Sequence, residues 1–131
     1  MSDYKVTIRH NDELSFTVDN GRAAIATEWN PAPGAYLATE LFLAGLGACM
    51  LATLVDYAQT NGITVDGASV EISAESATRP MRMSVIDVRY LLPAGLSAQQ
   101  VDALVRAGNR CKVHHTIEHH PDIRVHATVG G

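Results

Sequence analysis

The sequence Glu40-Leu-Phe-Leu-Ala-Gly-Leu-Gly-Ala-Cys49, which continues as Met-Leu-Ala-Thr-Leu-Val55, decides the fold. Only Glu40 is charged, so a helix formed by this stretch has no side that strongly favours water. The apolar run from Leu41 to Val55 is shorter than the roughly 20 residues needed to span a bilayer. We therefore expect a helix that is buried in a protein core, and no membrane partner.

Capping residues set the expected ends of this helix. Thr39 is a favourable N-cap, and Asn61-Gly62 stops a helix that reaches about Thr60. Gly45 and Gly47 lie within it, although glycine in a helix interior is unfavourable by roughly 0.5–1 kcal/mol relative to alanine. So thin a helix predicts that another helix or a ligand packs closely against it.

Short segments in which apolar and polar residues alternate flank the helix and predict β-strands. Turn residues such as Asp19-Asn20-Gly21 separate these segments, and Ser97-Ala-Gln-Gln100 matches the capping box of a further helix. The expected strands are residues 5–10, 14–18, 22–27, 68–76, 82–92 and 123–129, and the further helices start near Ser97 and at Lys112.

The order of these elements favours an α+β fold with antiparallel sheets, because the strands come as hairpins and not in βαβ units. A chain of 131 residues fits one domain, and we expect it to cover residues 1–131. The first three strands would cover only one face of the apolar helix. A homodimer would cover the other face.

Composition narrows the class of partner. Hydrophobic residues make up 47% of the chain and charged residues 18%, as in ordinary globular proteins. The formal net charge of −4 argues against a nucleic-acid partner, which needs a basic face. No cationic, apolar leader precedes the first predicted strand, so we expect a cytoplasmic protein. A disulfide in that compartment would be transient and catalytic.

The first of the two cysteines, Cys49, lies among apolar residues, and judged alone it is a core residue. Apolar surroundings raise the pKa of a thiol and make it inert. A reactive role would need a cation delivered by the tertiary structure. Arg22, just after the Asn20-Gly21 turn, is the best candidate, and Arg79 and Arg82 are alternatives.

The second cysteine, Cys111, has more favourable local surroundings. It can cap the short helix that starts at Lys112, and Arg110 and Lys112 flank it, so both effects favour the thiolate. Local electrostatics therefore indicate Cys111 as the nucleophile and Cys49 as its buried partner. The two lie 62 positions apart (111 minus 49), so only the fold can bring them together.

Five of the six histidines fall between His114 and His126. His115-Thr-Ile-Glu-His119 matches the H-x-x-E-H zinc-protease pattern, but Pro121 ends that helix too early to support such a site. Zinc held by Cys111, by His114 or His115, and by another histidine is an alternative. A solvated face that titrates near neutral pH is the simplest interpretation, and we expect no metal and no bound cofactor.

Together the two cysteine segments resemble the OsmC/Ohr family of osmotically inducible and organic hydroperoxide resistance proteins. The stretch from Glu40 to Cys49 is similar to the family's first cysteine motif. Cys111-Lys-Val-His114-His-Thr-Ile-Glu resembles the second, a cysteine followed by Pro-Val-His or a close variant. The order of the elements also matches, so the resemblance covers nearly the whole chain.

This resemblance implies an OsmC-like fold, in which two antiparallel sheets wrap long central helices in an intertwined homodimer with active sites at the subunit interface. It implies a thiol-dependent peroxidase that reduces organic hydroperoxides in oxidative-stress defence. Cys49 would attack the peroxide and Cys111 would resolve the product as a disulfide, which reverses the roles that local electrostatics indicate. An external dithiol or lipoyl-type reductant would then restore the thiols.

The chain departs from the family pattern at three places. Thr39 occupies the position of the catalytic glutamate, ten residues before the first cysteine, and Glu40 follows it by one residue, as in a less characterised branch. The alignment of Arg22 with the family's arginine is loose, and Lys112 replaces the usual proline. Despite these departures, we expect Glu40 and Arg22 to assist Cys49 through their charges. The alternative function is a module of the same fold that binds a small hydrophobic or thiol-reactive ligand without turnover.

Overall fold

The computed structural model describes residues 2–130, and contacts within the chain gather into two compact units, described separately below. The N-terminal unit extends to Ala44, and the C-terminal unit starts at Gly45, inside the long helix. Folding of both units as one domain remains a prediction. The elements are β1 (Thr7–Asp12), β2 (Ser15–Asp19), β3 (Ala24–Glu28), β4 (Ala35–Tyr36), α1 (Ala38–Thr60), β5 (Ser69–Ala77), β6 (Arg82–Leu91), α2 (Ala98–Gly108) and α3 (Lys112–Glu118).

The N-terminal unit contains a four-stranded sheet in the order β1-β2-β3-β4. Its first three strands are antiparallel, as predicted. The predicted turn between β2 and β3 is confirmed, because Gly21 has a φ of 90° and the Asn20 side-chain oxygen accepts from the backbone N–H groups of Arg22 and Ala23. β4 was not predicted, since two residues leave no alternating pattern, and it pairs with β3 in parallel.

The start of α1 corrects one sequence prediction. The helix begins at Ala38, so Thr39 lies inside its first turn and is not the N-cap. The Glu40 carboxylate accepts a hydrogen bond of 2.8 Å from the backbone N–H of Leu37. Glu40 stands three residues after Leu37, which is the spacing of the glutamate in a capping box. The glutamate, and not the threonine, therefore sets this end of the helix.

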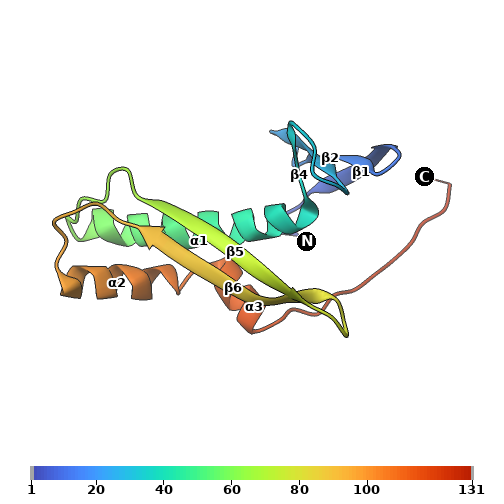
Figure 1. Cartoon of the computed structure of the whole chain (residues 1–131). Helices are drawn as coiled ribbons and strands as arrows, with labels where there is room; N and C mark the ends of the chain where they lie inside the picture. Colours follow the sequence, from blue (N-terminus) through green and yellow to red (C-terminus); the bar gives the residue numbers. More distant parts are fainter. Residues whose placement is uncertain (1, 131) are drawn as a thin grey trace. The chain divides into compact units, whose positions relative to one another are not determined.

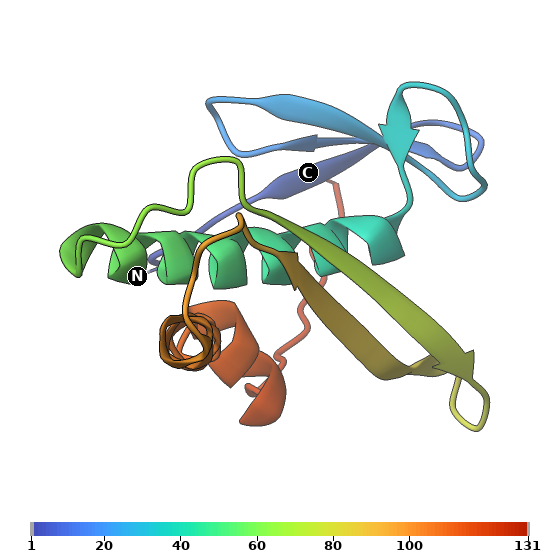
Figure 2. The same cartoon turned by 60° about the vertical axis from the view of Figure 1, so that its left-hand side comes forward.

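In the C-terminal unit, α1 buries a stripe of residues spaced at one helical turn. The β5–β6 hairpin crosses α1 in both views, and α2 and α3 follow each other beside it (Figures 1 and 2). Ile72 and Val70 of β5 lie over Gly47, where a Cβ would stand 2.5 Å from Ile72 Cδ1. The predicted close approach is confirmed at Gly47, but its partner is a strand and not the predicted helix or ligand. The buried stripe comprises Leu46, Gly47, Met50, Leu54 and Ala58.

Helix α2 begins as predicted. The Ser97 side chain accepts from the Gln100 N–H, and the Gln100 side chain accepts from the Ser97 N–H, which completes the capping box. Leu104 of α2 is fully buried against Leu54 of α1. The unit thus has one core cluster around Leu54 and Leu104 and a second around Leu46, Met50 and Cys111.

The predicted last strand, residues 123–129, is wrong for a single chain. In the part of the chain that the structure describes, no strand pairs with this segment, which runs on from α3 as an extended tail (Figure 1). Alternation marks a strand only when a neighbouring strand supplies the hydrogen bonds. Its apolar residues are instead strongly exposed: Ile123, Val125 and Val129.

Helix α1 has the length and composition of a membrane-spanning helix, with 23 residues and a mean hydropathy of 1.8. The helix is thus longer than the apolar run from Leu41 to Val55. Its buried stripe packs against β5, β6 and α2, which is also how the core helix of a globular protein behaves.

The two helix glycines offer a test of this packing. Gly47→Ala should destabilise the protein by about 1–3 kcal/mol, because the new methyl group overpacks Ile72. Gly45→Ala is the matched control, since a Cβ there meets no atom within 4 Å and should stabilise the helix by up to about 1 kcal/mol. Urea unfolding of both variants measures the difference, and equal shifts would contradict the packing at Gly47.

Candidate active site

Cys111 lies at the junction of α2 and α3 with its side chain turned into the core. It is the N-cap of α3, and its Sγ accepts a hydrogen bond of 3.2 Å from the backbone N–H of His114. The predicted capping role is therefore confirmed. The residue is 2% exposed and belongs to the core cluster with Leu46 and Met50. This thiol is consequently shielded from solvent.

Cys49 lies on α1, and it packs against the same cluster while remaining half-buried. The two thiols are close enough for Cys49 to raise the pKa of Cys111, and both cysteines are free. On the same helix, the Thr53 hydroxyl donates to the Cys49 carbonyl at 2.8 Å, which satisfies a polar group inside an apolar helix. The fold therefore brings together two thiols that lie 62 positions apart in the sequence. Cys49 is the more accessible of the two.

Burial is the main influence on the pKa of the Cys111 thiol. It raises the pKa of the Cys111 thiol above the ordinary value of 9.0, although the His114 N–H at the start of α3 acts to lower it. The hydrogen bond to Cys49 and the negative charge of Cys49 raise that pKa further. The expectation from local sequence, that Cys111 is the activated nucleophile, is therefore corrected, because desolvation exceeds the effect of the cap.

Tyr90 is a component of the site that sequence analysis missed. It projects from β6 and packs against both core clusters. Burial raises the pKa of the Tyr90 phenol, and the charge of the nearby Cys111 raises it too. Tyr90 alternates with Ile86 and Val88 on the inward face of its strand, and a tyrosine in such a stripe needs a partner for its hydroxyl. That requirement is the sequence feature that could have identified Tyr90 as part of the site.

A pocket of about 280 Å³ lies beside the thiol cluster, between α1, β6 and α3. Two of its walls, Leu46 and Met50, also pack against Cys111. Its lining is mostly apolar, and its polar groups come from α3 and from Asn109 at the end of α2. The residues are Leu46, Met50, Ile86, Val88, Asn109, His114, Ile117 and Glu118.

The predicted helpers Arg22 and Glu40 belong to the N-terminal unit, whereas both cysteines belong to the C-terminal unit. Arg22 is exposed after the β2–β3 turn, and Glu40 is exposed at the start of α1. Of the alternative arginines, Arg82 donates to the carbonyls of Thr78 and Pro80 and is thus engaged in the β5–β6 turn. Activation of Cys49 by Arg22 or Glu40 remains a prediction.

The structure shows polar contacts for the rings of two histidines in the segment, His114 and His119. A His114 ring nitrogen lies 2.9 Å from the Asn109 carbonyl, and the other lies 3.6 Å from the Glu118 carboxylate. His119 is bonded to the backbone carbonyl of His115. Between residues 2 and 130, no three side chains of histidine, cysteine, aspartate or glutamate gather as metal ligands would.

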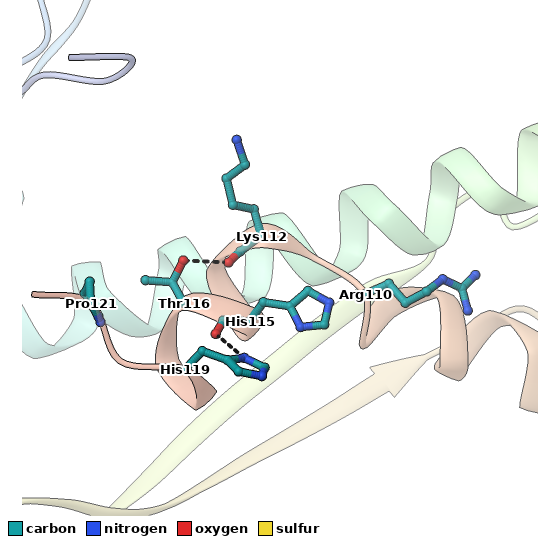
Figure 3. A pocket seen from close by; sticks show the side chains of 6 residues that line it. All are labelled: Arg110, Lys112, His115, Thr116, His119 and Pro121. Atoms are coloured by element: carbon teal, nitrogen blue, oxygen red, sulfur yellow. Dashed lines mark hydrogen bonds between the residues drawn. The ribbon is translucent and has the colours of Figure 1, made fainter. Parts of the chain in front are cut away.

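A wider, open pocket lies along α3 outside the thiol cluster (Figure 3). Arg110 and Lys112 border it but point in different directions, so they do not converge on one bound group. Pro121 closes one end of the lining. The pocket measures about 600 Å³ and is lined by Arg110, Lys112, His115, Thr116, His119 and Pro121.

The model of the family of OsmC-like proteins matches residues 32–126, and the chain therefore belongs to the OsmC family. A search of curated protein sequences finds no match to the chain. The matched range includes Glu40 and both cysteines.

Several solved structures share the fold. An OsmC-like protein from Mycoplasma pneumoniae is 22% identical, with a TM-score of 0.80, and the match covers 89% of this chain and 88% of that chain. An organic hydroperoxide resistance protein OsmC from Legionella pneumophila is 19% identical, with a TM-score of 0.61 and coverage of 89% and 91%. An OsmC-like hydroperoxide resistance protein from Jannaschia is 20% identical, with a TM-score of 0.60 and coverage of 95% and 91%. The predicted α+β, OsmC-like fold is confirmed.

The raised pKa of Cys111 predicts a loss of stability in alkali. The unfolded chain releases this proton near pH 9.0, whereas the folded chain still holds it. The contribution of the protonated Cys111 thiol to the free energy of unfolding is therefore fully present below pH 9.0. It is lost as the pH rises through the higher pKa of the folded state. Urea unfolding from pH 8 to 10.5, with a reductant present, should show a decline that becomes shallower in Cys111→Ala. A decline of the same slope in both proteins would contradict burial of an ionisable thiol.

Proposed function

We propose that this protein is a thiol-dependent peroxidase that reduces organic hydroperoxides with Cys49 and Cys111. The proposal rests chiefly on the placement of both cysteines at one core cluster, where Cys111 is buried and Cys49, which raises the pKa of Cys111, is only partly buried. A structural role for the pair would not require one cysteine to remain partly exposed. The family provides the expectation, and names of two structural neighbours refer to hydroperoxide resistance.

The chemistry is balanced in three steps. The Cys49 thiolate attacks one peroxide oxygen, the O–O bond breaks, and the alkoxide takes a proton to leave as an alcohol, with Cys49 oxidised to a sulfenic acid. The Cys111 thiolate then attacks the Cys49 sulfur, and the hydroxide released takes a proton to become water. An external dithiol, such as a lipoyl-type compound, reduces the resulting disulfide. No bound cofactor enters these steps.

Exposure supports this order of events. Cys49 is half-buried and can meet a peroxide, whereas Cys111 is 2% exposed. Burial, the hydrogen bond to Cys49 and the charge of Cys49 also raise the pKa of Cys111, so Cys111 is a poor first nucleophile. After oxidation, an external thiolate reaches Cys49 more readily, and Cys111 becomes the leaving group.

The neighbouring pocket supports an organic substrate. Aliphatic side chains of α1 and β6 form much of its wall, so it favours an alkyl or aryl group over water. Hydrogen peroxide has no such group and gains nothing from these contacts. We infer that bulky hydroperoxides react faster than hydrogen peroxide.

Intact-mass spectrometry of the reduced protein after one equivalent of cumene hydroperoxide tests the proposed function. The expected result is a loss of two hydrogen atoms, which signals a disulfide. Cys49→Ser should prevent any oxidation of the pair, and Cys111→Ser should stop at the sulfenic acid of Cys49. Full peroxide turnover by Cys49→Ser would overturn the proposal.

The same pocket supports a second function, the binding of a small hydrophobic or thiol-reactive ligand without turnover. Thr39 favours it, because this position carries a glutamate in the characterised hydroperoxidases that the chain resembles, and Thr39 has no carboxylate. Glu40 lies one residue later and is engaged in capping the helix. Two unreacted thiols after prolonged peroxide exposure, together with ligand-dependent thermal stabilisation, would support this function.

We also propose that the protein acts as a cytoplasmic homodimer. The tail from residue 123 to 129 presents alternating apolar side chains that find no strand within the described chain, with Val125 87% exposed. The N-terminal sheet likewise exposes apolar residues. A second copy of the chain supplies matching surfaces, because each copy carries both.

Charge substitutions in the tail test the dimer. Val125→Asp places a charge on the apolar face and should shift the molar mass from dimer to monomer at micromolar concentration. His126→Asp adds the same charge to the opposite face of the extended segment and should leave the dimer intact. Light scattering coupled to size-exclusion chromatography measures both. A monomeric wild type would contradict the dimer, and an intact Val125→Asp dimer would contradict the role of the tail.

A further inference from the structure

The Tyr90 hydroxyl is buried without a hydrogen-bond partner. Among the side chains that the structure describes, its oxygen is the one buried polar atom left in this state. Burying a hydroxyl without a partner is unfavourable, and a phenylalanine would fill the same space without that penalty. An unpartnered buried donor therefore indicates a partner in another state of the site.

The surrounding backbone makes room for this oxygen. A Cβ at Gly108, the last residue of α2, would collide with the Tyr90 hydroxyl and lie 3.2 Å from Cζ of the same ring. The Met50 carbonyl of α1 lies 3.4 Å from that Cβ position. Tyr90 thus reaches the place where the end of α2 meets α1, three residues before Cys111. The hydroxyl occupies space that exists only because residue 108 has no side chain.

Cys111 is the ionisable group whose charge affects the pKa of the Tyr90 phenol. Burial is the main cause that raises the pKa of the Tyr90 phenol, and the charge of a Cys111 thiolate raises it further, as a neighbouring anion does. Tyr90 also packs against the cluster that contains Cys111. In the reduced state the raised pKa of Cys111 favours the protonated thiol, which offers the phenol little charge to bind.

We propose that Tyr90 is a positioning residue for the resolving step, whose hydroxyl donates a hydrogen bond to the Cys111 sulfur when that sulfur is a thiolate. This rests on the proposed peroxidase function. Once Cys49 is a sulfenic acid, it carries no negative charge, so one of the causes that raise the pKa of Cys111 is removed. The phenol keeps its proton, holds the thiolate, and is released when the sulfur–sulfur bond forms and hydroxide leaves as water.

The other groups around Cys111 do not take the role of a side-chain donor to its thiolate. From α1 comes Cys49, which is the reaction partner. From α3 come the His114 backbone N–H, already bonded to the Cys111 sulfur, and the Val113 backbone N–H, which also lowers the pKa of Cys111. The His114 ring is held by the Asn109 carbonyl and by Glu118. The flanking Arg110 and Lys112 side chains line the open pocket along α3. From β6, Tyr90 contributes the hydroxyl with no other engagement.

Tyr90→Phe separates this role from simple packing. Sulfenic acid formation at Cys49, measured by rapid quenching with dimedone, should be unchanged within about twofold, because Tyr90 acts after that step. Disulfide formation should slow by roughly ten- to a hundredfold, the value of one hydrogen bond to a charged group. The pH profile of that step should shift to higher pH, and urea unfolding should show no loss of stability.

Two further variants complete the design. Tyr57→Phe removes a phenol from α1 that packs only on the other core cluster, and it should leave both steps unchanged. Gly108→Ala displaces the Tyr90 hydroxyl and should slow disulfide formation in the wild-type background, with a much smaller effect added to Tyr90→Phe.

The outcomes distinguish the two proposals. If wild-type protein forms the disulfide and Tyr90→Phe does so at the same rate and with the same pH profile, the role of Tyr90 is overturned while the peroxidase function stands. If wild-type protein forms no disulfide with peroxide, the peroxidase function fails, and the role of Tyr90 fails with it. A slowed, alkali-shifted disulfide step in a stable Tyr90→Phe protein supports both.

Discussion

The buried stripe on α1 is the constraint on which the C-terminal unit depends. Leu54 and Ala58 are fully buried, and Leu46 and Met50 nearly so, which removes apolar surface worth about 1.5–3 kcal/mol for each large side chain. The β5–β6 hairpin and α2 provide that cover. Because α2 must lie along this stripe, the segment that follows it delivers Cys111 to the turn of α1 that carries Cys49. The site is thus a consequence of core packing.

The same packing sets the division of roles between the thiols. Taking Cys111 out of water disfavours its thiolate, and the backbone N–H groups of His114 and Val113 at the start of a seven-residue helix do not offset that loss. Cys49 remains in contact with solvent on the edge of the stripe. A buried thiol held protonated beside an accessible one provides a resolving group that stays inactive until its neighbour is oxidised. The Tyr90 hydroxyl, unpartnered in the reduced protein, is proposed to donate to the Cys111 thiolate after Cys49 is oxidised.

Much of this structure could be predicted from local patterns. Alternation, turn residues and the Ser97 capping box located most elements, because each depends on neighbours a few residues away. The start of α1 was misplaced since both Thr39 and Glu40 suit a helix start. The tail at residues 123–129 shows a strand pattern without a strand partner in its own chain. The pKa of Cys111 could not be predicted, because burial is a property of the tertiary structure, and Tyr90 was missed for the same reason.

We infer that the folded chain holds Cys49 and Cys111 within disulfide reach before any oxidant arrives. Equilibrium in glutathione redox buffers, measured once in native buffer and once in strong denaturant, gives the effective concentration of one thiol toward the other. Folding should raise that concentration by roughly a hundredfold or more, because the pair is already in contact. A native value equal to or below that of the denatured chain would contradict the account.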